Sequence, residues 1–582
     1  MLKKLIRQML FTQILSSMTV MICLLIDSIM IGRFLGVDAI SAYGYASPVL
    51  LVFSAISLMI GAGSQVLCGR TMGKGDRDGT NRCFTAAVTS SLVFSVIGIA
   101  VVFIFSDPLC TFLGAGVNKA DNPVFDLTKS YLRGFVLGAP AFMLQQIMVP
   151  YMQMAGNRKR LLIAIGAMSI GDILFDLLNV FVFKMGIFGM GLASALSYFV
   201  AIIFAVSFFL NKNCIFKFKG SLLNKTVFLS LFKEGSPVLI NQVCLVLLPL
   251  ARNNLLTYYG GSTAVAAYSV ISSVGSTLFS IGTAVNSVSL TLSSIFFADK
   301  DKKSLKETMK VLITYSVSIY LIFDIIILLA ARPIVLTFIK DVSASDMAIL
   351  GMRLVVPSYI PCVLNSAFKN YYQGIGHTKL TMVICMMQNF IMTVISALIL
   401  GSLLGATGVW LSLACGEILT STFVFTYISI RNKKFSYRLD DLLLMSEIQG
   451  INDEKLFNQV ITKQEDVVDV SKKASDFCKE HGFESKTGMY IALAIEEMAN
   501  NIISYGFSDG KAHSIDIRII ANDEDAMLRI RDNCRNFDPV KYLELHQSDD
   551  PVAHIGIKMV MKLVKDAKYE NSLGLNNLLL TL

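Results

Sequence analysis

Charged residues are scarce in this chain of 582 residues. Asp, Glu, Lys and Arg make up 16% of it, against about 25% in an average soluble protein. Tryptophan occurs once, histidine occurs five times, and no two of the eleven cysteines form a Cys-x-x-Cys pair. The low charge excludes an ordinary water-soluble protein along the whole length, and the cysteine spacing excludes a zinc ribbon or a dithiol redox motif.

Long apolar runs are what the chain has instead. A membrane-spanning helix needs about 20 apolar residues, and we count twelve such runs before residue 430. They are centred near Met21, Ser57, Val96, Met143, Phe175, Phe199, Val246, Gly282, Phe323, Val363, Val394 and Phe423. The first run continues past the length of a signal peptide without an Ala-x-Ala site, so we expect it to remain as a span.

Basic residues gather in alternate loops of this twelve-span arrangement. Residues 1–450 hold 35 Lys and Arg against 20 Asp and Glu, whereas residues 451–582 hold 16 against 22. Basic loops stay on the cytoplasmic side, which predicts a multi-pass protein of the inner (plasma) membrane with both termini cytoplasmic. Basic residues beside membrane helices also explain the positive charge without a nucleic-acid partner.

The first six spans resemble the second six. Residues 152–159 align with residues 372–379 at an offset of 220, and Ala42-Tyr43 aligns with Ala267-Tyr268 at an offset of 225. Because six is an even number, the second copy enters the membrane from the same side, and the repeat is parallel. Two such lobes, predicted over residues 1–220 and 221–430, would enclose a cavity that opens alternately to either side.

Carboxylates inside the predicted spans are the candidates for function. A charged group at this depth costs roughly 2.5 to 3.5 kcal/mol on insertion scales, so it usually has a partner or a task. Asp27 falls late in the first span, and Asp172, Asp176 and Asn179 share one face of the fifth span because they are spaced i, i+4, i+7. Hydrogen bonding between helices is the alternative role for all four.

Charged residues of the second lobe share no helical face, and we expect structural or interfacial roles for them. They are Glu234, Arg252, Asp324 and Glu417.

Three stretches of the membrane part resemble the MATE multidrug exporters: residues 27–33, 61–76 and 186–195. The resemblance covers all twelve spans. It implies export of small organic, often cationic, compounds across the lipid bilayer, driven by inward flow of H+ or Na+.

The same resemblance implies that Asp27, Asp172 and Asp176 form the cation site of the N-terminal lobe. Asp172 stands where the family usually has Asn, which leaves the choice between H+ and Na+ open. Crowded carboxylates favour proton binding near neutral pH.

After a juxtamembrane linker over residues 431–454, the pattern becomes that of a soluble α+β domain over residues 455–582. Alternating apolar residues predict strands at 456–461, 513–520, 527–532, 567–571 and 576–582. Helical periodicity predicts helices at 465–479, 486–505 and 552–565. Helices layered on an antiparallel or mixed sheet would result.

Four residues of this domain are spaced for nucleotide chemistry. Glu497 and Asn501 lie one helical turn apart, where an amide oxygen can ligate Mg2+ and a carboxylate can orient or deprotonate a hydroxyl nucleophile. Asp532 ends a predicted strand and can accept a hydrogen bond from an adenine amino group. Gly556 lies near the start of a predicted helix, where backbone N–H groups can approach phosphate.

This series resembles the GHKL ATPase fold, a two-layer α+β sandwich, and most closely the anti-sigma-factor serine kinases. Residues 497–501 match the N box, residues 532–539 the first glycine box and residues 556–560 the second. The resemblance implies binding of ATP with Mg2+. Nucleotide contacts would come from Asp532, Asn533 and Gly556, the metal contact from Asn501 and the catalytic carboxylate from Glu497.

The boxes also depart from the family pattern. Cys534 stands where the first box normally has Gly, His554 occupies a position often held by Gly, and Tyr505 replaces the usual His. Glu496 and Asn500 form a second pair with the same spacing as Glu497 and Asn501. A nucleotide-free domain that binds a partner protein therefore stays open as an alternative to an active ATPase.

These patterns together predict an all-α polytopic membrane protein with a C-terminal α+β domain. The favoured function is an H+- or Na+-coupled antiporter for organic cations whose cytosolic domain senses nucleotide or modifies a cytosolic regulator protein. One alternative is a membrane-anchored signalling protein, an anti-sigma-type serine kinase or switch that uses the spans as a sensor. Another is a flippase for lipids or polysaccharide precursors, which would call for more cationic residues inside the spans than Arg252.

Overall fold

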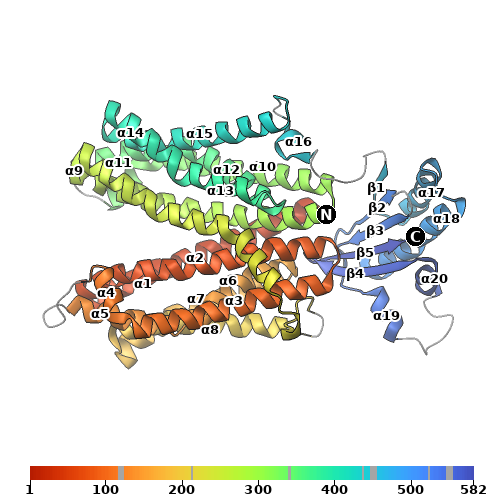
Figure 1. The fold of residues 1–582 in the computed structure, drawn as a ribbon, viewed down its shortest axis with the longest axis horizontal. Coiled ribbons are helices and arrows are strands. Elements are labelled where there is room, and N and C mark those ends of the chain that lie inside the picture. The colour runs from red at the N-terminus through yellow and green to blue at the C-terminus, as the bar shows by residue number, and fades with distance from the viewer. Residues whose placement is uncertain are drawn as a thin grey trace.

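The computed structural model describes residues 1–115, 123–211, 214–338, 342–435, 438–445, 455–521, 525–545 and 555–582. It has two parts, a long helical part and a smaller α+β domain at one end of it (Figure 1). The end of the helical part nearest the α+β domain is called the proximal end below, and the opposite end the distal end.

The helical part is built from helices long enough to cross a membrane. Among the described residues there are 11 such helices, or up to 12 if the bent pair α5 and α6 is one span. The N-terminal lobe contains α1 (Leu2–Met30), α2 (Val37–Gly73), α3 (Arg77–Ile104), α4 (Ser106–Phe112), α5 (Pro123–Val136), α6 (Ala139–Met154), α7 (Arg158–Leu178) and α8 (Gly186–Phe209). The C-terminal lobe contains α9 (Lys225–Ala298), α10 (Lys302–Phe338), α11 (Val342–Val355), α12 (Tyr359–Gly374), α13 (Thr378–Met386), α14 (Met392–Leu404) and α15 (Ala406–Arg431), followed by the short α16 (Leu439–Leu442).

The helical path is interrupted at two places, within α9 and between α5 and α6. Gly261, with a φ of 64°, divides α9 into the spans Lys225–Gly261 and Thr263–Ala298. Between α5 and α6 the chain bends by 52°. Pro140 lies in the first turn of α6, where a helix tolerates proline because the N–H group that proline lacks would have no partner within the helix.

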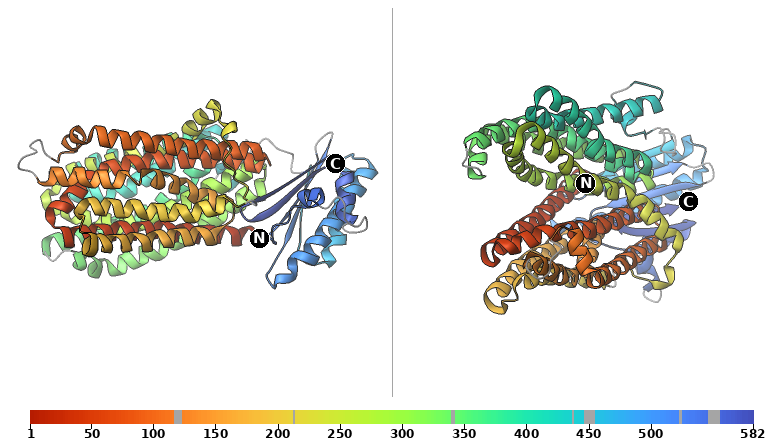
Figure 2. Two further views of the ribbon diagram at one scale, coloured as in Figure 1. Left: turned by 90° about the horizontal axis from the view of Figure 1, so that it is seen from below. Right: turned by 60° about the vertical axis from the view of Figure 1, so that its left-hand side comes forward.

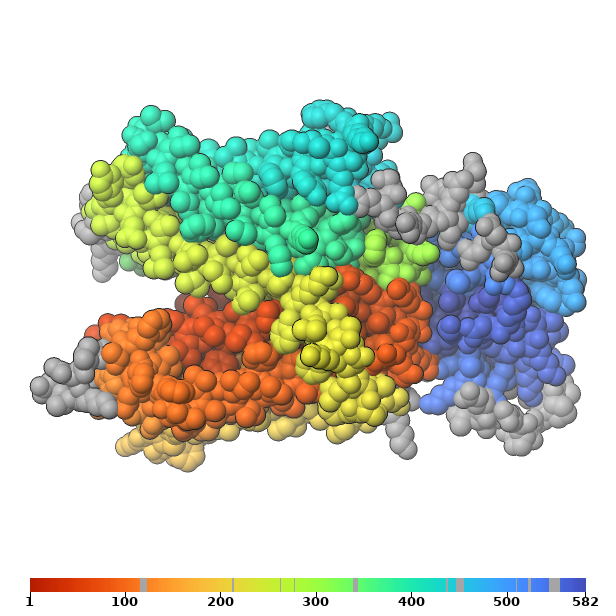
Figure 3. Space-filling model, viewed as in Figure 1, coloured from red at the N-terminus to blue at the C-terminus, as the bar shows by residue number. Residues whose placement is uncertain are grey.

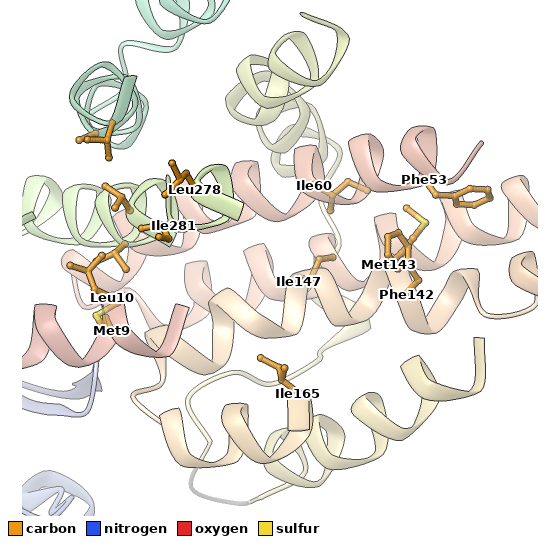
Figure 4. Close-up of a cluster of buried hydrophobic side chains, with 14 of the residues drawn as sticks. Met9, Leu10, Phe53, Ile60, Phe142, Met143, Ile147, Ile165, Leu278 and Ile281 are labelled. Carbon is orange, nitrogen blue, oxygen red and sulfur yellow. The ribbon is translucent and has the colours of Figure 1, made fainter. Parts of the chain in front are cut away.

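The two lobes meet at the proximal end and separate toward the distal end (Figures 1 and 3). Glycines on α2 allow close approach to α9, since a Cβ at Gly63 would lie 2.0 Å from the Leu231 carbonyl oxygen. Arg70 on α2 pairs with Glu234 on α9 at 3.2 Å. Apolar side chains of both lobes also meet there, as the close-up of the buried cluster shows (Figure 4).

The α+β domain is a five-stranded antiparallel sheet with helices on one face (Figure 2). The strand order is β1-β2-β3-β5-β4. The strands are β1 (Leu456–Ile461), β2 (Ile515–Ala521), β3 (Ala526–Asp532), β4 (Asp566–Ser572) and β5 (Leu575–Thr581), and the helices are α17 (Glu465–Glu480), α18 (Ser485–Gly506), α19 (Pro539–Leu545) and α20 (Ile555–Leu563). Every predicted strand and helix is confirmed to within a few residues, and residues 552–554 of the last predicted helix lie outside the described ranges.

Side chains alternate between the two faces of the sheet, as the pleat requires. Ile517 on β2 and Ile530 on β3 belong to the apolar core under the helices. Their neighbours Arg518, Arg529 and Arg531 lie on the other face, which meets the proximal loops of the helical part. The face without helices is therefore a basic docking surface.

Candidate functional site

Three carboxylates are buried together inside the N-terminal lobe. Asp27 projects from α1, and Asp172 and Asp176 project from α7, which packs beside α1. The three residues are 6%, 5% and 0% exposed respectively, and Asp27 is close enough to both aspartates of α7 to interact with them. The structure thus brings Asp27 of the first span together with Asp172 and Asp176 of the fifth.

These carboxylates have no counter-ion among the residues that the structure describes. Four of their oxygens lack any hydrogen-bond partner there: Asp27 Oδ1, Asp172 Oδ1 and both carboxylate oxygens of Asp176. The Ser194 hydroxyl makes one long contact, 3.5 Å from Asp27 Oδ2. Because an unpaired buried carboxylate is strongly unfavourable, this arrangement is suited to hold a cation or protons.

Asn179, the fourth predicted member, has a different set of contacts. Its Nδ2 donates to the Gly186 carbonyl oxygen at 2.9 Å, and its Oδ1 accepts from the Met185 N–H at 3.1 Å. Gly189 has to be glycine here, since a Cβ would lie 1.9 Å from Asn179 Oδ1. The Asn179 side chain therefore holds the turn between α7 and α8, and its polar atoms do not face the carboxylates.

A second polar cluster lies in the C-terminal lobe. Glu417 Oε2 accepts from Asn365 Nδ2 at 2.8 Å and from Gln388 Nε2 at 3.2 Å, and Lys369 Nζ donates to Gln388 Oε1 at 3.0 Å. Lys369 is 7% exposed within a candidate span. Arg252 is thus not the only buried cation of the spans, contrary to the sequence interpretation. The i, i+4 pair Asn365 and Lys369 was the signal that could have revealed it.

The nucleotide-site candidates of the α+β domain converge at the end of α18. A Cβ at Gly556 would lie 1.9 Å from Glu497 Oε2, so this glycine in the first turn of α20 lets the Glu497 carboxylate approach. Neither Glu497 nor Asn501 makes a side-chain hydrogen bond to a described residue. Glu496 instead accepts a hydrogen bond from the Ser471 hydroxyl, between α17 and α18. Of the two glutamates, Glu496 thus has a side-chain partner and Glu497 has none among the described residues.

Asp532 ends β3 as a buried acceptor, 4% exposed. Its Oδ1 accepts from the Cys534 N–H at 2.8 Å and from Asn576 Nδ2 at 2.9 Å. Burial raises the pKa of Asp532, and these two hydrogen bonds oppose the rise. The carboxylate is thus fixed in place by its neighbours before any ligand arrives.

Asn533 and Cys534, the next two residues of the first glycine box, both contact neighbouring segments of the domain. Asn533 braces the loop, because its Oδ1 accepts from the Ser514 N–H at 3.0 Å and its Nδ2 donates to the Ala512 carbonyl oxygen. The Cys534 thiol lies beside Asp532 and against the end of α18, where a Cβ at Gly506 would come 2.7 Å from the sulfur. A side chain at position 534 therefore occupies space next to the predicted adenine acceptor. His554 lies outside the described residues.

Two helical lobes, one of which contains the buried carboxylates, with an α+β domain at one end, define a multi-pass membrane transporter carrying a second domain. The MatE family model matches residues 13–178 and 237–426, and the chain belongs to that family. Residues 461–582 match the histidine kinase-like ATPase domain.

Known relatives share the membrane part of the chain. The multidrug export protein MepA of Staphylococcus saprophyticus is 22% identical over 408 residues, which is 69% of this chain and 88% of the relative. The MATE transporter VcmN of Vibrio cholerae in its bent form has a TM-score of 0.70 at 17% identity, covering 77% of this chain and 98% of that one. An outward-facing MATE family transporter has a TM-score of 0.66 at 19% identity, covering 74% and 96%.

Proposed function

We propose that this protein is a cation-coupled antiporter that exports organic, cationic compounds, with a cytosolic domain that binds ATP and Mg2+. The observation that carries the proposal is the cluster of unpaired carboxylates on α1 and α7. The relative named as a multidrug export protein supports the choice of substrate class. A sensor without transport gives no reason for three uncompensated carboxylates at this depth.

Coupling follows from competition for one negative site. A proton or Na+ bound by Asp27, Asp172 and Asp176 cancels the repulsion among them, and a cationic substrate would be attracted to the same charge. If access to the site alternates between the two ends, inward movement of one cation then drives outward movement of the other.

Basic loops support a cytoplasmic proximal end. Arg70, Lys74 and Arg77 flank the turn between α2 and α3, and Lys300, Lys302 and Lys303 flank the turn between α9 and α10. Positive loops favour the cytoplasm. The distal opening between the lobes would then face outward, and the ATPase-like domain would lie where ATP is.

The residues of the α+β domain fit a bound Mg-ATP. Asp532 would accept from the adenine amino group, the N–H groups that begin α20 would meet phosphate, and Asn501 would hold Mg2+. ATP would supply a transferable phosphoryl group. Glu497 would lie beside that end of the site and would take the proton of a hydroxyl on a regulator protein. The domain would accordingly act as a nucleotide sensor or a serine kinase.

Transport by the full chain in lipid vesicles tests the proposal. A fluorescent organic cation should be driven across the membrane when a gradient of H+ or of Na+ is imposed, and should stop when that gradient is collapsed with an ionophore. The ion whose gradient suffices identifies the coupling ion. Movement that neither gradient accelerates, in vesicles shown to contain folded protein, would refute antiport.

A further inference from the structure

The α+β domain attaches to the C-terminal lobe through a buried ion network. The turn between α9 and α10 carries Asp299 and Asp301, and both face the basic surface of the sheet. Asp301 Oδ2 lies 3.2 Å from Arg518 Nη1 and 3.1 Å from Arg529 Nη2. Asp299 Oδ2 lies 2.7 Å from Arg531 Nη2. The Asp301 and Arg518 side chains are only 3% and 2% exposed, so this network is a specific joint, called the C-lobe arm below.

The same sheet attaches to the N-terminal lobe through its edge strand β4 and the turn that follows it. In the turn between β4 and β5, the Leu573 N–H donates to the Met154 carbonyl oxygen at 2.6 Å, and Arg158 Nη2 donates to the Leu573 carbonyl oxygen at 3.3 Å. The backbone at Gly574 packs directly on the α6–α7 turn. Arg77, at the start of α3, donates to the Tyr569 carbonyl oxygen and pairs with Asp538 at 3.4 Å. These contacts form the N-lobe arm.

Both arms belong to one rigid element. The C-lobe arm uses β2 and β3, the N-lobe arm uses β4 and its turn, and β5 joins β3 to β4 by continuous antiparallel pairing. Two cavities lie at the junction, one of about 1270 Å³ beside the N-lobe arm and one of about 780 Å³ between the arms. The two arms are thus separate attachments on one sheet.

The lobes themselves are closed at this end, where α2 packs on α9. A Cβ at Gly73 would lie 2.3 Å from the Ile295 carbonyl oxygen, only a few residues before Asp299. Opening the proximal end must move these two helices apart. A rigid sheet fixed to both lobes resists that movement unless one arm releases.

We propose that the C-terminal domain is a bracket that holds the proximal ends of the two lobes together and so restrains opening of the transporter on that side. This inference rests on the proposed function in taking alternating access of the lobes as the transport cycle. It gives the domain a mechanical role that needs no phosphoryl transfer. Asp538 and Tyr569 of the N-lobe arm adjoin the loop after Asp532, so the bracket lies next to the proposed nucleotide site.

Distance measurements on the full chain in nanodiscs test the bracket without requiring transport. Spin labels on noncanonical residues at Lys159 and Lys303 report separation of the lobes, and a second pair at Lys303 and Lys472 reports release of the domain. One variant, Asp299→Asn with Asp301→Asn, breaks the C-lobe arm, because it removes both carboxylates that face the arginines of the sheet. The other, Arg77→Gln with Arg158→Gln, weakens the N-lobe arm by removing its arginine contacts. The control is Lys306→Gln, which removes an ion pair with Asp440 that does not reach the α+β domain.

Either arm variant should add a longer distance between the lobes, with roughly a tenfold rise in the proximally open fraction, the change that about 1.4 kcal/mol produces. The control should match the wild type. Two results would overturn the bracket: a domain that stays docked in both variants, or a domain that is released while the lobes keep their wild-type distance. Failure of antiport in vesicles would leave these distances unchanged, so the two proposals fail separately.

Discussion

Two groups of buried aspartates in this protein differ in whether cations lie beside them. Asp301 at the junction meets three arginines, whereas Asp176 in the N-terminal lobe meets no cation among the described residues. Burial alone would raise the pKa of Asp301, but Arg529, Arg518 and Arg531 hold it well below its ordinary value. The carboxylates buried with counter-ions form a joint between domains, and we propose that those buried without them form a site for a mobile cation.

The difference also assigns opposite energetic signs to the two groups. Removing one partner from a buried, paired network costs about 3 to 5 kcal/mol, because it leaves an uncompensated charge behind. Neutralising an unpaired carboxylate removes such a charge. Neutralising a carboxylate of the N-terminal lobe should therefore lower transport without lowering stability, whereas neutralising Asp301 should lower stability.

Loss of transport is the largest effect expected. Asp27→Asn or Asp176→Asn should reduce gradient-driven transport to the level of empty vesicles, because the amide cannot exchange a cation, while the amount of folded protein in the membrane stays normal. The matched control is Asp107→Asn in the same lobe, whose carboxylate pairs with Lys129 Nζ at 2.5 Å. Wild-type transport in both site variants would reduce the cluster to a packing role.

Nucleotide binding gives the next largest effect. Asp532→Asn should weaken ATP binding to the full chain by about ten- to a hundredfold, the value of a lost hydrogen bond to a charged group of roughly 1.5 to 3 kcal/mol. Glu497→Ala serves as the comparison, since it should keep ATP and lose any phosphoryl transfer. Asn501→Ala should impair both through Mg2+. Calorimetry that shows no ATP binding to the folded wild-type protein would refute the nucleotide site.

Glu570 on β4 should make docking depend on pH. Burial raises its pKa to about 8, with Arg77 opposing and Asp76 and Asp299 adding to the rise. In a released domain it would titrate near its ordinary value of 4.5. The docked state then holds a proton that the released state has lost, so docking should weaken as pH rises from about 5 to about 8 and stay level above that.

The slope cannot exceed about tenfold per pH unit for one group. Glu570→Gln should flatten it, because the amide stays neutral at every pH. The spin-label pair at Lys303 and Lys472 measures the docked fraction across this range. A slope that is the same in the variant and the wild type would assign the pH dependence to other groups.

The smallest effect concerns Cys534. Its thiol adjoins Asp532, so Cys534→Gly should clear space beside the adenine acceptor and tighten ATP binding by less than about tenfold, on the order of 1 kcal/mol. Cys478→Ala, a buried cysteine of α17 outside the site, is the control. Weaker binding in the glycine variant would show that the thiol supports the site.

Local patterns in the sequence predicted much of this structure. Apolar runs and alternation located the spans, strands and helices, and helical spacing placed Asp172 and Asp176 on one face. The roles of Asn179 and Asn533 could not be foreseen, because both side chains bond to backbone atoms whose position depends on a turn. Lys369 was missed because it is a single cation in a run that otherwise mixes apolar with uncharged polar residues.

The docking surface was hidden for a different reason. Arg518, Arg529 and Arg531 alternate with isoleucines, which is the ordinary pattern of a sheet with one face in water. Only the tertiary structure shows that Asp299 and Asp301, more than 200 residues earlier in the chain, cover that face. Three arginines on one sheet face, with Asp516 beside Arg529 as the one acid of that face in β2, were the available signal.

Thermal unfolding of Asp176→Asn and Asp301→Asn, measured side by side on the full chain, tests the comparison most directly. Asparagine keeps the shape of the side chain and its ability to cap α10, so only the charge changes. Asp176→Asn should leave the melting temperature unchanged or raise it, and Asp301→Asn should lower it. A melting temperature that falls in Asp176→Asn and stays constant in Asp301→Asn would contradict the division between an unpaired binding site and a paired joint.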